Sequence, residues 1–152
     1  MKPHSDFEEF LKLLEDHNVE YLIVGGYAVA FYGYPRFTKD LDIFYLNDSD
    51  NIEKLKKVLI LFGFDESVIS REALSQSGNI ITFGLEPLRV DLMNEIDGVD
   101  YERAKHHSQR GTYGETDVTF IGKDALLLNK KATPRIRDKG DVDELEKRSN
   151  DI

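Results

Sequence analysis

A short apolar run that stops at two glycines constrains the fold of this chain more than any other feature. Tyr21–Val24 has the composition of a buried strand, Gly25 and Gly26 interrupt it, and apolar residues at helical spacing follow from Tyr27. A strand that turns into a helix on glycine offers backbone N–H groups at the helix start, where anions bind well. The sequence therefore predicts a phosphate-binding turn at Gly25 and Gly26.

Three aspartates lie in strand patterns whose alternate positions are apolar. Asp40 and Asp42 open the pattern at 40–46, and Asp91 lies in the pattern at 88–93. Because successive strand side chains alternate faces, Asp40 and Asp42 point to one side, and we expect all three carboxylates to converge away from the apolar core. Such carboxylates repel each other unless a cation neutralises them, and hard oxygen ligands suit Mg²⁺ or Mn²⁺. An ordinary polar strand face is the alternative.

The order of the patterns predicts an α+β fold, a mixed sheet with helices packed on it and not a doubly wound parallel sheet. The expected strands cover residues 21–24, 40–46, 80–83, 88–93, 112–113 and 117–121. The expected helices cover residues 5–16, 27–32, 51–62, 71–74, 101–107, 122–132 and 138–148. A capping box from Ser5 to Glu8 is expected to start the first helix.

Length and composition favour one cytoplasmic domain. No linker divides the 152 residues, so we expect a single domain over 1–152, with an N-terminal helix at 5–17, a core at 20–122 and C-terminal helices at 123–148. The absence of cysteine excludes a disulfide scaffold and a thiolate metal site. The longest apolar run, 58–62, is far below the ~18 residues of a membrane span, so no membrane partner is expected.

Charge is distributed unevenly along the chain. The net charge of -9 argues against general nucleic-acid coating. Residues 103–139, however, hold nine Lys or Arg against four acidic residues. This basic segment is a candidate phosphate-binding surface on the side of the aspartates, although a solvated helix face fits the composition equally well.

These motifs resemble the DNA polymerase β-type nucleotidyltransferase superfamily. Its signature is a hydrophobic-Gly-Gly turn, an Asp-x-Asp pair about ten residues later and a third acidic residue on a later strand. The pattern is similar to small bacterial proteins related to AbiEii toxins of toxin–antitoxin pairs, and to lincosamide and aminoglycoside nucleotidyltransferases. Residues 128–132 and 135–141 also resemble the Lys…Arg-x-Lys-Asp-x-x-Asp segment of that group, with Pro134 and Arg137 in place of the expected Gly and Lys.

The resemblance implies a metal-dependent nucleotidyltransferase that moves an NMP from an NTP, ATP first, to a hydroxyl acceptor and releases pyrophosphate. Two Mg²⁺ or Mn²⁺ ions are implied as cofactors. The acceptor is left open among a tRNA end, a protein and a small molecule such as an antibiotic, and a cognate antitoxin is a candidate partner. A non-catalytic nucleotide-binding or toxin–antitoxin interaction module on the same fold is the alternative.

Residue roles follow from the same resemblance. Asp40, Asp42 and Asp91 are the implied catalytic metal ligands, and Asp91 helps to deprotonate the acceptor hydroxyl. The implied nucleotide-binding residues are Gly25, Gly26, Arg36, Thr38, Lys39, Lys130, Arg135 and Arg137. Asp138 and Asp141 are expected to orient the basic groups, and a side chain at Gly26 is expected to crowd the phosphates. For each basic residue a solvent-exposed role is the alternative.

Overall fold

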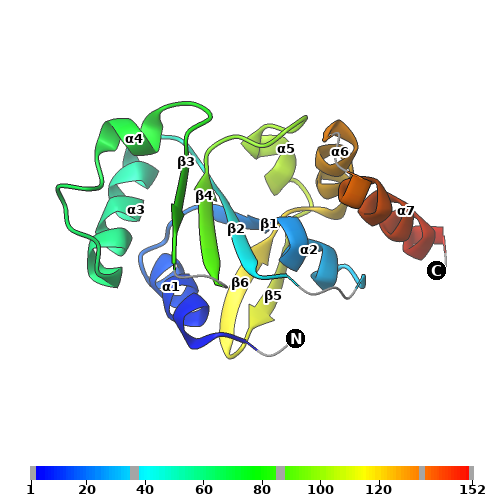
Figure 1. Cartoon of the computed structure of the whole chain (residues 1–152), viewed down its shortest axis with the longest axis horizontal. Coiled ribbons are helices and arrows are strands. Elements are labelled where there is room, and N and C mark those ends of the chain that lie inside the picture. Colours follow the sequence, from blue (N-terminus) through cyan, green and yellow to red (C-terminus); the bar gives the residue numbers. More distant parts are fainter. Residues whose placement is uncertain (1–2, 35–37, 85–87, 134–135, 151–152) are drawn as a thin grey trace.

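The computed structural model describes residues 3–34, 38–84, 88–133 and 136–150, and it confirms the predicted α+β fold (Figure 1). Six strands form one mixed sheet in the order β3-β4-β2-β1-β6-β5. β1 pairs antiparallel with β2 and parallel with β6, β2 pairs parallel with β4, and β3–β4 and β5–β6 are antiparallel pairs. The strands are β1 Tyr21–Val24, β2 Asp40–Tyr45, β3 Ile80–Phe83, β4 Arg89–Met93, β5 Gln109–Tyr113 and β6 Thr116–Phe120.

The described helices follow the predicted order, with shifted ends. They are α1 Ser5–Asp16, α2 Gly25–Phe31, α3 Ser49–Phe62, α4 Arg71–Ser75, α5 Tyr101–Lys105, α6 Lys123–Ala132 and α7 Ile136–Asn150. The two glycines form the first turn of α2 instead of preceding it. α5 ends two residues early, because His106 is extended and His107 has a positive φ of 61°. In the described ranges no helix is long and apolar enough to cross a membrane.

The larger core lies on the sheet face that carries the apolar residues of β2. Leu41, Ile43 and Tyr45 are fully buried there. The ring of Phe10 from α1 packs edge-on against Phe83 of β3 at 5.2 Å between centroids, so α1 lies over this face. The Tyr45 hydroxyl donates to a backbone carbonyl of α4 at 2.6 Å. α1, α3 and α4 thus cover one face, and the alternate residues of β2 and β4 are left for the other.

The second face is only partly covered. Phe44 of β2 packs against Tyr101 of α5, with ring centroids 5.2 Å apart. α2, α5 and α6 lie on this side, away from α3 and α4 (Figure 1). Phe44 follows Asp42 by two residues and Asp40 by four along β2, so all three side chains lie on the face of α5 and α6. The face of the aspartates is therefore walled by helices and not fully open to solvent.

The predicted capping box is wrong. His4 is the N-cap of α1, and no side chain caps that end. The Glu8 carboxylate instead accepts hydrogen bonds from the Glu115 backbone N–H at 3.1 Å and the Thr116 hydroxyl at 3.4 Å. A contact across 107 residues cannot be inferred from a four-residue motif, and it fastens α1 to the β5–β6 turn.

Candidate active site

The β2–β4 register brings the three aspartates together. In this parallel pair Asp42 lies opposite Asp91, and Asp40 lies opposite Arg89. Partners in register point to the same side of a sheet, so the four side chains form two adjacent rows. The predicted convergence of Asp40, Asp42 and Asp91 is therefore present in the fold.

These side chains line a cavity of about 300 Å³. The triad of Asp40, Asp42 and Asp91 lines it together with Gly25. Asn129 and Lys130 of α6 line it too, as does Thr133 directly after that helix. The remaining lining includes the apolar side chains of Ile80, Met93 and Ile96 and the acidic side chains of Glu95 and Asp97. The cavity thus combines the three carboxylates with a lysine, an apolar set and two further acids.

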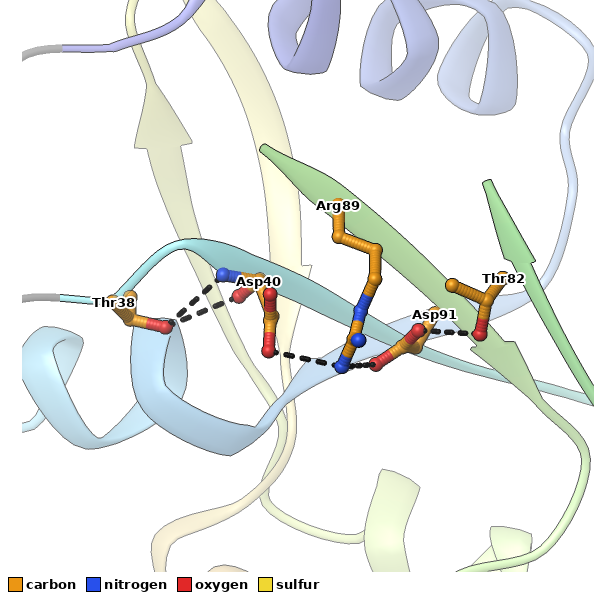
Figure 2. A network of polar contacts seen from close by, with 5 residues as sticks. All are labelled: Thr38, Asp40, Thr82, Arg89 and Asp91. Carbon is orange, nitrogen blue, oxygen red and sulfur yellow. Dashed lines mark hydrogen bonds and ion pairs between the residues drawn. The ribbon is translucent and has the colours of Figure 1, made fainter. Parts of the chain in front are cut away.

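A polar network joins two of the carboxylates (Figure 2). The Arg89 guanidinium donates from Nη2 to Asp40 Oδ2 at 3.2 Å and to Asp91 Oδ2 at 3.4 Å. The Thr82 hydroxyl donates to Asp91 Oδ1 at 2.7 Å, and the Thr38 hydroxyl donates to the Asp40 backbone carbonyl at 3.2 Å. Asp91 is therefore oriented from both sides, by a neighbouring strand and by its own strand.

Asp42 is the most perturbed acid of the cluster. Burial raises its pKa to about 7, and the charges of Asp91 and Asp40 and a hydrogen bond with Asp91 act in the same direction. The charge of Lys130 opposes this shift only in part. The site therefore holds more negative charge than it neutralises, and an added cation would relieve that excess.

The donor set fits Mg²⁺ or Mn²⁺ by chemistry, since all three candidate ligands are carboxylates and the like charges repel. The three carboxylates are not arranged as metal ligands in this structure. Within the described part of the chain, no group of three or more acidic or histidine side chains is arranged to hold a metal ion. Arg89 lies between Asp40 and Asp91 and gives a physical reason. A metal would have to draw the carboxylates together in place of the guanidinium.

The two glycines each allow the close approach of a different side chain. Gly25 has φ of +68°, and a β-carbon there would collide with the Asp42 carboxylate. A β-carbon at Gly26 would meet the Thr38 side chain at 2.9 Å. Within the protein, a side chain at Gly26 would therefore meet Thr38, and the predicted crowding of the phosphates stays a prediction. Gly25 is the glycine that lets the helix start approach the triad.

Lys130 is held inside the cavity wall. Its Nζ lies 3.3 Å from Asp141 Oδ2, with 8% of the lysine side chain and 2% of the aspartate side chain exposed. This pairing of α6 with α7 agrees with the expectation that Asp141 orients a basic group. Removal of Asp141 would leave a buried charge, and we expect Asp141→Asn to lower the free energy of unfolding by ~3 kcal/mol, measured by urea denaturation. An unchanged unfolding midpoint would contradict that role.

Among the other predicted nucleotide-binding residues, the described side chains of Thr38 and Lys39 do not line the cavity. Lys39 is exposed, and Thr38 contacts the backbone of Asp40. Arg36 and Arg135 lie outside the described residues, as do the side chains of Arg137 and Asp138.

Within the predicted basic surface at 103–139, three of the described basic side chains form ion pairs with acidic residues. Lys105 pairs with Glu20 at 3.4 Å, Arg110 with Glu15 at 2.7 Å and Lys131 with Glu146 at 2.6 Å. Folding distributes Lys105, Arg110 and Lys131 over α5, β5 and α6, so they reach different acidic partners. Lys130 does line the cavity.

Sequence reasoning assigned no role to Arg89 or Thr82. Arg89 was detectable as a member of the Asp91 face, two residues away on one strand. Thr82 needed the β3–β4 register, in which it lies opposite Asp91. Hairpin spacing alone does not fix that register when the turn type is unknown.

Comparisons with known proteins point to nucleotidyltransferases. The model of a family described as "Nucleotidyl transferase of unknown function (DUF2204)" matches residues 4–151. Comparison with curated proteins gave no match.

Solved structures with a similar fold include three nucleotidyltransferase-type proteins. The lincomycin-bound lincosamide antibiotic adenylyltransferase LnuA is 17% identical, with a TM-score of 0.55 over 95% of this chain and 97% of that chain. A candidate nucleotidyltransferase from Thermotoga maritima is 12% identical, with a TM-score of 0.58 over 96% and 91%. ANT(2'')-Ia in complex with adenylyl-2''-tobramycin is 12% identical, with a TM-score of 0.58 over 94% and 90%. At these identities the likeness shows the fold.

Proposed function

The chain belongs to the nucleotidyl transferase family described as DUF2204, and we propose that it transfers an NMP from an NTP to an acceptor hydroxyl with release of pyrophosphate. The observation that carries the proposal is the convergence of Asp40, Asp42 and Asp91 in one cavity beside the glycine turn. The raised pKa of Asp42 adds support, because it marks a site whose negative charge is left for a cation to balance.

Four residues of the cavity have chemical roles in this proposal. Asp40, Asp42 and Asp91 would hold Mg²⁺ or Mn²⁺, which when bound lowers the pKa of the acceptor hydroxyl and stabilises charge on the leaving phosphate. Asp91, fixed by Thr82, accepts the proton of the acceptor hydroxyl. Lys130, held by Asp141, faces the nucleotide phosphates from the α6 wall.

Lys130→Ala should weaken NTP binding by ~1–3 kcal/mol, because a charged hydrogen bond to phosphate is lost. The matched control is Lys131→Ala, which removes the adjacent, exposed lysine paired with Glu146. Binding of a non-hydrolysable ATP analogue, measured by calorimetry on folded variants, should fall for Lys130→Ala and stay unchanged for Lys131→Ala. Equal affinities in both variants would remove Lys130 from the nucleotide site.

We further infer a small-molecule acceptor with an amine and an apolar face. Ile80, Met93 and Ile96 line the same cavity as Asp91, and Ile80 is 58% exposed, so these side chains can pack an uncharged ring. Glu95 and Asp97 line the same cavity and add negative charge, which attracts an ammonium group and repels an RNA backbone. LnuA binds lincomycin, and ANT(2'')-Ia binds an adenylylated tobramycin, which supports a small acceptor on this fold.

The test is transfer of label from α-labelled NTPs. Incubation with Mg²⁺ and a panel of amine-bearing hydroxyl compounds, total tRNA and cell protein should label a small molecule. Asp97→Asn should raise the KM for that acceptor without changing the KM for NTP. Labelled tRNA would overturn the small-molecule acceptor but leave the transferase intact. If no NTP, metal and acceptor gives a labelled product, the non-catalytic module becomes the better reading.

A further inference from the structure

Arg89 occupies a position that the proposed metal also requires. One nitrogen, Nη2, contacts both Asp40 Oδ2 and Asp91 Oδ2, at 3.2 and 3.4 Å (Figure 2). A metal ion ligated by both carboxylates would also be a cation in that place. Two cations in one place repel each other, so the guanidinium and the metal exclude one another.

The guanidinium is placed so that it can leave. The side chains of Arg89 and Asp40 are each 40% exposed, and ion pairs with that much solvent contact are weak. Asp91, by contrast, is 14% exposed and keeps its hydrogen bond from Thr82 when Arg89 moves. Departure of Arg89 therefore opens the site without releasing Asp91.

Nucleotide phosphates are natural partners for the displaced guanidinium. Arg89 lies in the first position of β4 and lines the same cavity as the triad and Lys130. A guanidinium binds phosphate oxygens through two parallel hydrogen bonds, which two separate carboxylates contacting one nitrogen do not provide. An arriving NTP would thus offer Arg89 a better anion and vacate the place between Asp40 and Asp91.

We propose that Arg89 is a built-in counter-cation, a positioning residue that weakens metal binding to the nucleotide-free protein and moves to the phosphates when NTP binds. This inference rests on the proposed function. It couples the two ligands: NTP increases metal affinity, and by linkage metal increases NTP affinity through the same interaction. The empty protein is then kept from holding a reactive metal without its substrate.

Titration of the nucleotide-free protein with Mn²⁺, with free Mn²⁺ read by electron paramagnetic resonance, tests the competition. Arg89→Gln should bind Mn²⁺ about tenfold more tightly than wild type, because two weak ion pairs no longer compete. The matched control is Arg71→Gln, which makes the same charge change at an exposed pair with Glu53. Its Mn²⁺ affinity should equal that of wild type.

A measurement on the wild-type protein keeps the test independent of the variant's folding. Addition of Mg²⁺ should shift the Arg89 Nε–H resonance in the nitrogen–proton spectrum, assigned by its loss in Arg89→Lys. A resonance that does not move at saturating Mg²⁺ would overturn the displacement.

The possible failures are distinguishable. Equal Mn²⁺ affinities for wild type and Arg89→Gln would overturn the role of Arg89 and leave the proposed transferase standing. Absence of Mn²⁺ binding in both proteins, with and without a non-hydrolysable NTP, would overturn the metal site itself and the inference with it.

Discussion

Asp91→Asn is expected to lower kcat for nucleotidyl transfer by about 10²-fold or more, with little change in NTP affinity. Asp91 accepts a hydrogen bond from Thr82 at 2.7 Å, lies opposite Asp42 in the parallel pair and lines the cavity with the apolar side chains proposed to bind the acceptor. Its interaction with the acceptor proton strengthens only as the hydroxyl is deprotonated, so its loss appears in the rate and not in ground-state binding.

The matched control for this variant is Asp117→Asn, an exposed aspartate on β6 at a distance from the cavity. Steady-state kinetics should give Asp117→Asn the kcat of wild type. Both variants should keep the circular dichroism spectrum of the parent. A folded Asp91→Asn protein with wild-type kcat would show that Asp91 has no part in proton transfer.

Asp42→Asn is expected to stabilise the metal-free protein by roughly 2–4 kcal/mol above pH 7. Burial and the neighbouring carboxylates raise the pKa of Asp42 from 3.8 to about 7. Between these two values the folded protein keeps a proton that the unfolded chain releases, so stability falls as the pH rises. Above pH 7 the cost of the buried charge is complete, and the neutral asparagine does not incur it.

Urea denaturation in EDTA at pH 5 and pH 8 measures this effect. The advantage of Asp42→Asn over wild type should grow between the two pH values, whereas Asp117→Asn should show no such growth. Added Mg²⁺ should stabilise wild type and have little effect on Asp42→Asn, since binding to the native state alone raises stability. If Asp42→Asn is less stable than wild type at pH 8, the charged Asp42 carboxylate does not destabilise the folded protein and the prediction is wrong.

The sequence predicted the elements that bear the site because their patterns are local. Alternation along β2 separates Asp40 and Asp42 from the buried Leu41 and Ile43, and the fold keeps that separation. The glycine turn was predicted from the same kind of signal, although α2 begins at Gly25. Periodicity thus defines which face of the sheet a side chain takes. The parallel β2–β4 pair then brings Asp91 next to Asp42.

What the sequence could not supply depends on contacts between distant segments. Lys130 and Asp141 pair across the α6–α7 connection, and Glu8 reaches the β5–β6 turn. Within the basic segment, Lys105 and Arg110 pair with Glu20 and Glu15, two acids that lie far away in the sequence. Charge counted along a chain does not predict charge in space once strands and helices turn the side chains in different directions.

The most direct test of the metal-dependent site is the anomalous scattering of a crystal grown with Mn²⁺ and a non-hydrolysable NTP. The proposal predicts manganese density bounded by the carboxylates of Asp40, Asp42 and Asp91, with the triphosphate beside Gly25 and Lys130 and with Arg89 withdrawn from the carboxylates. Manganese bound elsewhere, with Arg89 still bridging Asp40 and Asp91 in the nucleotide complex, would contradict it.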